Sequence, residues 1–133
     1  MSSTSNPLGT HTNRNLIDIS NKKFAIVVSE WNEEITQSLF SGSVESLLHF
    51  GAKKENIIRQ DVPGSFELPL ASQWMAQKKE VDAVICLGCV VQGETRHFDF
   101  ICQSVAQGIK DVSLKYDKPI VFGVLTTDNL QQA

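Results

Sequence analysis

Residues 81–100, "VDAVICLGCVVQGETRHFDF", decide the fold, because an apolar run there gives way to a polar turn and then to aromatic residues. The run 81–91 is rich in β-branched residues and is followed by a Gln-Gly pair, which predicts a buried strand that leads into a turn. It is about half as long as the twenty residues of a membrane-spanning helix, and it contains Asp82. The run therefore predicts a strand that leads into a charged turn carrying His97.

Three further segments have the same apolar character. They are "KFAIVVS" (23–29), "NIIRQDV" (56–62) and "PIVFGVLT" (119–126). "LIDIS" (16–20) is predicted to add a short edge strand.

The segments between these strands have helical periodicity. The first has an apolar stripe made of Phe40, Val44, Leu47 and Leu48, and Gly51 follows it as a predicted C-terminal glycine. The second is "LPLASQWMAQKKE" (68–80), which ends in lysines suited to a helix C-terminus. The third has an apolar stripe made of Ile101, Val105, Ile109 and Val112, and a fourth is predicted to begin at "TDNLQQA" (127–133) with Thr127 or Asp128 as N-cap.

Strands that alternate with helices indicate βαβ units. We therefore predict an α/β fold, a three-layer α/β/α sandwich with a four-stranded parallel sheet, flavodoxin-like in architecture. Residues 16–133 are expected to form this single domain. Residues 1–15, "MSSTSNPLGTHTNRN", have no hydrophobic h-region and too few apolar groups to order themselves, so we expect a flexible tail.

Composition narrows the classes of function. With 41% apolar residues, 20% charged residues and a net charge of −3, the chain of 133 residues favours neither nucleic acid nor a membrane as a partner. Its three cysteines are too few for a disulfide framework, which indicates a reducing, cytoplasmic compartment. In "CLGC" (86–89) the two thiols would point to opposite faces of a strand, so we predict buried structural thiols and no metal site.

In an open α/β sheet, ligands bind beyond the carboxyl ends of the strands. The segments at these ends are "SEWN", "PGSFELP", "VVQGETRHFD" and "LTTDN". Trp31 is either a residue at the edge of the core or a flat stacking surface for an aromatic ligand. Gly64 would permit a positive φ, and Ser65 and Glu67 either cap a helix or face a ligand that carries hydroxyl or N–H groups.

The third segment combines a glycine turn with a titratable side chain. Gly93 and Thr95 at a helix N-terminus suit an anion such as phosphate, and His97 can exchange a proton near neutral pH. A helix cap beside a surface histidine would give the same pattern. No second ligand stands at metal-binding spacing from His97.

Taken together, "FAIVVSEWN", "VPGSFELP", "DAVICLGCVVQGETRHFDF" and "VFGVLTTDNLQQA" resemble the lumazine synthase family, from about residue 16 to the end of the chain. The resemblance implies condensation of 5-amino-6-(D-ribitylamino)uracil with 3,4-dihydroxy-2-butanone 4-phosphate to 6,7-dimethyl-8-ribityllumazine, the penultimate step of riboflavin biosynthesis. It implies a transferase that needs no cofactor and no metal.

The resemblance also implies roles for single residues. His97 is the proton shuttle for imine formation and phosphate elimination, and Trp31 stacks on the pyrimidine. The other substrate-binding residues are Ser65, Phe66 and Glu67 for the ribityl chain, Cys89, Val90 and Val91 alongside the pyrimidine, Glu94 and Thr95 for the butanone phosphate, and Phe122, which reaches the active site of the neighbouring subunit. A homo-oligomer follows, a pentamer or a larger icosahedral shell, with "LIDIS"-like segments pairing between subunits.

The family continues past the equivalent of "NLQQA" through a helix with an Arg and a Lys near the substrate phosphate. The 133 residues do not include it, so either the sequence is shortened or this form is impaired. Two rival interpretations stay open. One is a flavin- or riboflavin-binding module that stacks its ligand on Trp31, and the other is a shell protein without catalytic activity.

Overall fold

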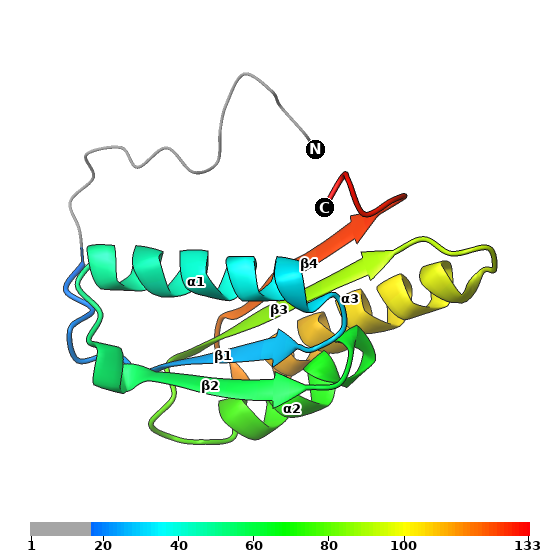
Figure 1. Cartoon of the computed structure of the whole chain (residues 1–133). Coiled ribbons are helices and arrows are strands. Elements are labelled where there is room, and N and C mark those ends of the chain that lie inside the picture. The colour runs from blue at the N-terminus through cyan, green and yellow to red at the C-terminus, as the bar shows by residue number, and fades with distance from the viewer. Residues whose placement is uncertain (1–16) are drawn as a thin grey trace.

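The computed structural model describes residues 17–133, and in it strands and helices alternate along the chain (Figure 1). The elements are β1 (Phe24–Ser29), α1 (Glu33–His49), the 3₁₀ turn η1 (Lys54–Asn56), β2 (Ile57–Val62), the 3₁₀ turn η2 (Ser65–Glu67), α2 (Leu68–Ala76), β3 (Ala83–Val91), α3 (His97–Tyr116) and β4 (Ile120–Thr127). All four predicted strands are confirmed.

The four strands form one parallel sheet in the order β2-β1-β3-β4. Val28 of β1 lies beside Asp61 of β2 and Leu87 of β3. The carboxyl ends of all four strands therefore point to the same end of the molecule (Figure 1). This is the end where the polar turns of the sequence meet.

Helices cover both faces of the sheet. Alternate residues of β1 enter two apolar clusters: Ala25 and Val27 pack with residues of α2 and α3, whereas Ile26 and Val28 pack with α1. In Figure 1, α1 lies on one side of the sheet and α2 with α3 on the other. Burial of each large aliphatic side chain contributes about 1.5–3 kcal/mol, so both layers are needed to hold the sheet. The three-layer α/β/α fold is confirmed.

Helix α1 packs through a narrower stripe than predicted. Phe40, Val44 and Leu47 contact the cluster beneath α1, but Leu48 is 41% exposed. Gly51 follows the helix with φ of 103°, a conformation that only glycine adopts without strain. The predicted C-terminal glycine is confirmed.

Helix α2 ends before its predicted lysines. Its last residue is Ala76, so Lys78 lies beyond it. Lys118, just before β4, instead donates from Nζ to the carbonyl oxygens of Ala76 and Lys78, at 2.9 Å each. A cation from a distant segment thus satisfies the helix C-terminus.

The prediction of a fourth helix is wrong for this structure. Residues 128–133 form a turn in which side chains bond to the backbone: Asn129 Oδ1 accepts from the Gln132 N–H, and Gln132 Oε1 accepts from the Asp128 N–H. Thr127 Oγ1 donates to the Asn129 carbonyl and so does not act as an N-cap acceptor. These local bonds compete with helix formation over residues 128–133.

The predicted edge strand "LIDIS" is also not a strand where it is described. Residues 17–19 have no regular structure, and Ile17 is 81% exposed. Asp18 Oδ1 accepts from the Ser20 N–H in a local turn, and hydrogen bonds from Ser20 lower the pKa of that carboxyl. No described strand pairs with residues 17–20. Residue 16 and the predicted tail 1–15 lie outside the described residues.

Within residues 17–133, no helix combines the length and the apolar character that crossing a bilayer requires.

Candidate active site

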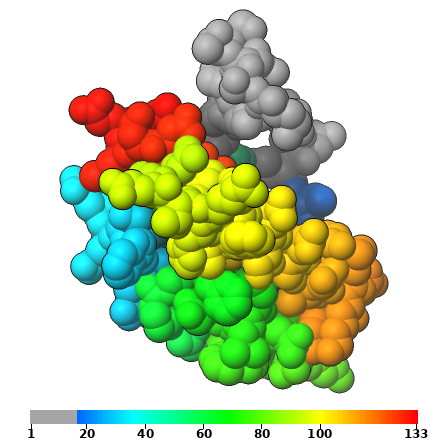
Figure 2. Space-filling view, turned by 90° about the vertical axis from the view of Figure 1, so that its right-hand side faces the viewer, coloured from blue at the N-terminus to red at the C-terminus, as the bar shows by residue number. Residues whose placement is uncertain are grey.

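A cavity of about 670 Å³ lies at the carboxyl ends of the strands. It is lined by Trp31, Pro63, Gly64, Ser65, Phe66, Glu67, Cys89, Val90, Val91, His97 and Ile101. Figure 2 faces this end of the molecule and shows the segments after β1, β2 and β3 coming together. The volume and the mostly apolar lining are those of a small-molecule site.

The cavity collects most of the predicted site residues. Eight of them line it: Trp31, Ser65, Phe66, Glu67, Cys89, Val90, Val91 and His97. Glu94 and Thr95 lie in the exposed turn before His97 and do not line it. Phe122 lies on the edge strand β4, 45% exposed, and is not brought to the cavity of its own chain.

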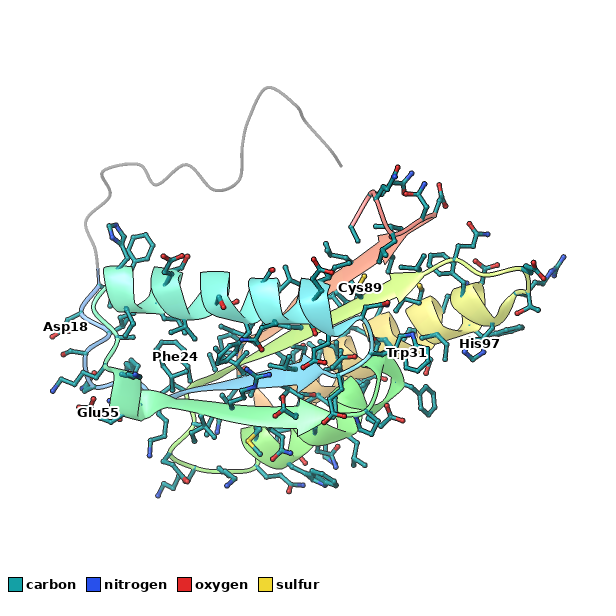
Figure 3. All side chains as sticks on the ribbon, viewed as in Figure 1. Asp18, Phe24, Trp31, Glu55, Cys89 and His97 are labelled. Carbon is teal, nitrogen blue, oxygen red and sulfur yellow. The ribbon has the colours of Figure 1, made fainter. Side chains whose placement is uncertain are left out.

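Trp31 is an exposed aromatic surface and not a residue of the core. Trp31 is 73% exposed, while its backbone N–H donates to the Pro63 carbonyl at 3.1 Å. Phe66, also 59% exposed, adds a second aromatic side chain to the lining. Such exposure of two large rings at one cavity favours stacking with a flat ligand. Figure 3 shows Trp31 and His97 at the same end of the molecule.

The segment 64–67 is capped differently from the prediction. Gly64 precedes η2 with φ of −146°, so the expected positive φ is wrong. Glu67 Oε2 accepts from the Gly64 N–H at 2.9 Å, and the Glu67 N–H donates to the Gly64 carbonyl at 3.3 Å. The Glu67 carboxylate therefore performs the capping that was open to Ser65, in the first turn where the macrodipole favours an anion.

Ser65 is left with a buried hydroxyl and no partner. Ser65 is 7% exposed, and its Oγ makes no hydrogen bond within residues 17–133. Ser29, at the end of β1, has the same property at 0% exposure. An unpaired buried hydroxyl costs free energy, and of these two serines only Ser65 lines the cavity, so its hydroxyl is available to a bound polar atom.

His97 begins helix α3 with an exposed side chain. The backbone N–H of His97 donates to Thr95 Oγ1 at 3.3 Å, which confirms a threonine hydroxyl at this helix N-terminus. One turn further along α3, Ile101 also lines the cavity. Because residues four apart share a helix face, this turn and helix bring the His97 ring to the side of the cavity.

The two cysteines of "CLGC" are buried and free, as predicted. Burial raises the pKa of the Cys86 thiol to about 12, against a smaller lowering by a hydrogen bond from Ser72. Burial also raises the pKa of Cys89. Both thiols therefore stay protonated near neutral pH.

Within residues 17–133, no three His, Cys, Asp or Glu side chains gather closely enough to hold a metal ion.

Three residues of the site were not singled out from the sequence. Ile101 was assigned to the core, although its spacing from His97 could have indicated the cavity. Pro63 lines the cavity because β2 ends one residue before it. Asn32 follows Trp31 in the chain, and its side-chain Nδ2 donates to the Cys89 carbonyl at 2.9 Å. This contact joins distant segments, so no local pattern indicates it.

Comparison with known proteins assigns the family. A family profile described as 6,7-dimethyl-8-ribityllumazine synthase matches residues 21–133. A curated protein of that name from Cytophaga hutchinsonii is 59% identical over 133 residues, covering 100% of this chain and 83% of the relative. One from Parabacteroides distasonis is 51% identical, covering 87% of this chain and 72% of the relative, and one from Christiangramia forsetii is 46% identical, covering 100% and 80%. This chain belongs to the 6,7-dimethyl-8-ribityllumazine synthase family.

Proposed function

We propose that this chain is a transferase that condenses 5-amino-6-(D-ribitylamino)uracil with 3,4-dihydroxy-2-butanone 4-phosphate to 6,7-dimethyl-8-ribityllumazine. Membership of the family supports the reaction. The observation that carries it to this chain is the cavity in which Trp31, the segment 65–67 and His97 meet. It offers an aromatic surface, polar groups and a proton carrier at one place.

The pyrimidine and its ribityl chain are assigned to the wall nearest Trp31. The exposed Trp31 ring supplies a stacking surface, and the end of β3 (Cys89, Val90, Val91) supplies an apolar edge. Polar groups for the ribityl hydroxyls come from the unpaired Ser65 hydroxyl and from the backbone around Phe66 and Glu67. A polyol needs such donors and acceptors, because each of its hydroxyls loses water on binding.

The butanone phosphate is assigned to the turn before α3. Glu94 and Thr95 lie in that turn, where the first backbone N–H groups of the long helix α3 point out of its N-terminus along the helix axis. His97 at the first helical position would stand between this anion and the amine of the other substrate. It would then give and take the protons of imine formation and of phosphate elimination.

Orientation of the two substrates supplies much of the catalysis. Amine and ketone already condense in water, so holding them together replaces a bimolecular step by a near-intramolecular one. Proton transfer by His97 adds about 10²- to 10⁴-fold. We assign no role to a cofactor or a metal.

We also propose a homo-oligomer whose sites lie between adjacent subunits. Phe122 supports this, because it is an aromatic side chain 45% exposed on an edge strand and away from its own cavity. An exposed edge strand with apolar side chains favours contact with another chain. The free cysteines of the described chain suit a reducing compartment such as the cytoplasm.

The test is to mix the chain with both substrates and follow lumazine formation by absorbance. Turnover well above the uncatalysed condensation is expected. Absence of turnover together with tight binding of riboflavin would favour a flavin-binding module. Large particles that bind neither substrate would favour a shell protein without catalytic activity.

A further inference from the structure

We propose that Asn32 is a positioning residue for Trp31, holding the exposed ring over the cavity through a hydrogen bond to the end of β3. This inference rests on the proposed function, because it assigns to Trp31 the task of stacking on the pyrimidine. Asn32 itself does not line the cavity. It acts through the backbone that it shares with Trp31.

The backbone of Asn32 adopts an unusual conformation. Its φ of 61° and ψ of 52° lie in the left-handed region, which among described non-glycine residues only Asp117 also enters. An asparagine tolerates this conformation better than most residues, but at a cost in strain. The turn it creates lets the chain leave β1 with Trp31 and begin α1 at Glu33.

The side chain of Asn32 is diverted from its usual task. Asparagine at a helix N-cap commonly accepts a hydrogen bond from the first turn, but the Asn32 side chain makes no such bond. Its Nδ2 instead donates to the Cys89 carbonyl at 2.9 Å, across 57 residues of sequence. The Asn32 side chain therefore does not cap α1 and instead contacts Cys89 in the wall of the cavity.

The sheet explains why the Cys89 carbonyl is free to accept. Along β3, Val84 and the following Gln92 direct their N–H groups to the β4 side, as bonds to the Pro119 and Thr127 carbonyls show. Backbone groups alternate in direction along a strand, so Cys89 faces the β1 side. The pairing of β1 with β3 ends at Val28 and Leu87, and the Asn32 amide takes the place of the next backbone donor.

Trp31 has few other restraints. Its N–H bonds to the Pro63 carbonyl at 3.1 Å, and its ring is 73% exposed. The ring therefore depends on the direction of its own Cα–Cβ bond, which the flanking residues set. Pro63 on one side and Asn32 on the other tie Trp31 to the ends of β2 and β3, which are the walls of the cavity.

Two substitutions separate positioning from stability. Asn32→Gly keeps the left-handed backbone without strain and removes the side-chain amide. The relief of backbone strain then offsets the loss of the hydrogen bond to Cys89, so the midpoint of thermal unfolding should change little. Asn32→Asp keeps size and backbone tolerance, but its carboxylate has no donor for the Cys89 carbonyl. Asn56→Asp is the matched control, because Asn56 Nδ2 also donates to a backbone carbonyl, that of Ser20, near the opposite end of β1.

The first measurement needs no substrate. The chain has two tryptophans, so Trp74→Phe leaves Trp31 as the only one, and time-resolved fluorescence anisotropy then reports the mobility of its ring. Asn32→Gly and Asn32→Asp should increase the fast, large-amplitude component, while Asn56→Asp should not. An unchanged anisotropy decay in both Asn32 variants would overturn the proposal, whether or not the chain is an active synthase.

The second measurement divides the effect between the two substrates. Both Asn32 variants should raise KM for ribitylaminouracil about three- to tenfold, the range of an aromatic stacking contact, and leave KM for butanone phosphate unchanged. Equal increases in both KM values, or none in either, would overturn the proposed role. If the chain shows no turnover at all, the proposed function fails and the anisotropy result alone decides on the restraint.

Discussion

Gly88 of β3 lies directly beneath Ser65, and a Cβ atom at Gly88 would be 2.5 Å from the Ser65 hydroxyl oxygen. The same Cβ would be 3.0 Å from Leu68 Cδ1 at the start of α2. The absence of a side chain at Gly88 therefore lets the segment 65–67 approach the sheet. This approach sets the position of Ser65, Phe66 and Glu67 in the wall of the cavity.

Gly88→Ala should displace the Ser65 segment and impair both folding and binding. We expect a loss of about 1–3 kcal/mol in the free energy of unfolding, the usual cost of an overpacked core, and a higher KM for ribitylaminouracil. Urea unfolding and initial rates measure the two effects. A Gly88→Ala variant with the stability and the KM of the wild type would contradict the close approach of Ser65 to Gly88.

The double variant Gly88→Ala/Ser65→Ala is the control for this prediction. Removal of Ser65 Oγ leaves the new methyl group with its closest contact at Leu68, at 3.0 Å, so part of the lost stability should return. Ser65→Ala alone should be neutral or stabilising in the free protein, because its hydroxyl is buried without a partner. Additive effects of the two single changes would contradict a direct contact.

Trp31→Ala should weaken binding of the ring-bearing substrate selectively. Loss of an exposed stacking surface is worth about 0.5–1.5 kcal/mol, so KM for ribitylaminouracil should rise by up to about tenfold, with KM for the phosphate substrate unchanged. Trp74→Ala is the matched control, because Trp74 is 50% exposed and lies outside the cavity. Equal losses for both substrates would indicate a collapsed cavity instead.

His97→Ala should lower kcat about 10²- to 10⁴-fold while leaving the oligomeric state intact, since the His97 side chain is exposed and is the proposed proton carrier. Steady-state kinetics and analytical ultracentrifugation measure the two properties. His49→Ala, at the C-terminal end of α1 and outside the cavity, is the control. Turnover unchanged by His97→Ala would remove the assigned role.

Phe122 should act in the site of a neighbouring subunit. If so, Phe122→Ala and His97→Ala chains, each impaired alone, should regain activity when unfolded and refolded together. Some sites in the mixed oligomer would then receive Phe122 from one chain and His97 from the other. A mixture no more active than the two variants kept apart would mean that one chain supplies both residues to a site, or that Phe122 does not take part in it.

The buried Cys86 thiol should make the protein less stable in alkali. Its pKa is raised to about 12 in the folded chain, against about 8.5–9 when unfolded, so between these values the unfolded state loses a proton that the folded state keeps. This contribution is fully present below pH 8.5 and falls by up to about 1.4 kcal/mol per pH unit above it. Cys86→Val removes the thiol, so its stability should fall less steeply from pH 8.5 to 10.5 in urea unfolding under reducing conditions. If the free energy of unfolding fell equally steeply with pH in the wild type and in Cys86→Val, the raised pKa of Cys86 would be contradicted.

The sequence by itself determined the elements and most of the cavity. Apolar runs and helical stripes predicted β1 to β4 and α1 to α3, because each pattern reports which side chains leave water. Because parallel strands end at the same edge of a sheet, these elements also predicted that Trp31, Ser65 and His97 lie at one end of the molecule. Local chemistry sufficed for Gly51 as well, since only glycine takes its φ of 103° without strain.

Only the tertiary structure decided features that depend on contacts between distant residues. It assigned capping of η2 to Glu67 and left the Ser65 hydroxyl unpaired above Gly88. It directed the Asn32 amide to Cys89 and the Lys118 ammonium to the end of α2. The predicted strand is absent over residues 17–20 and the predicted helix is absent after β4, because the side chains of Asp18, Asn129 and Gln132 accept backbone hydrogen bonds in local turns instead.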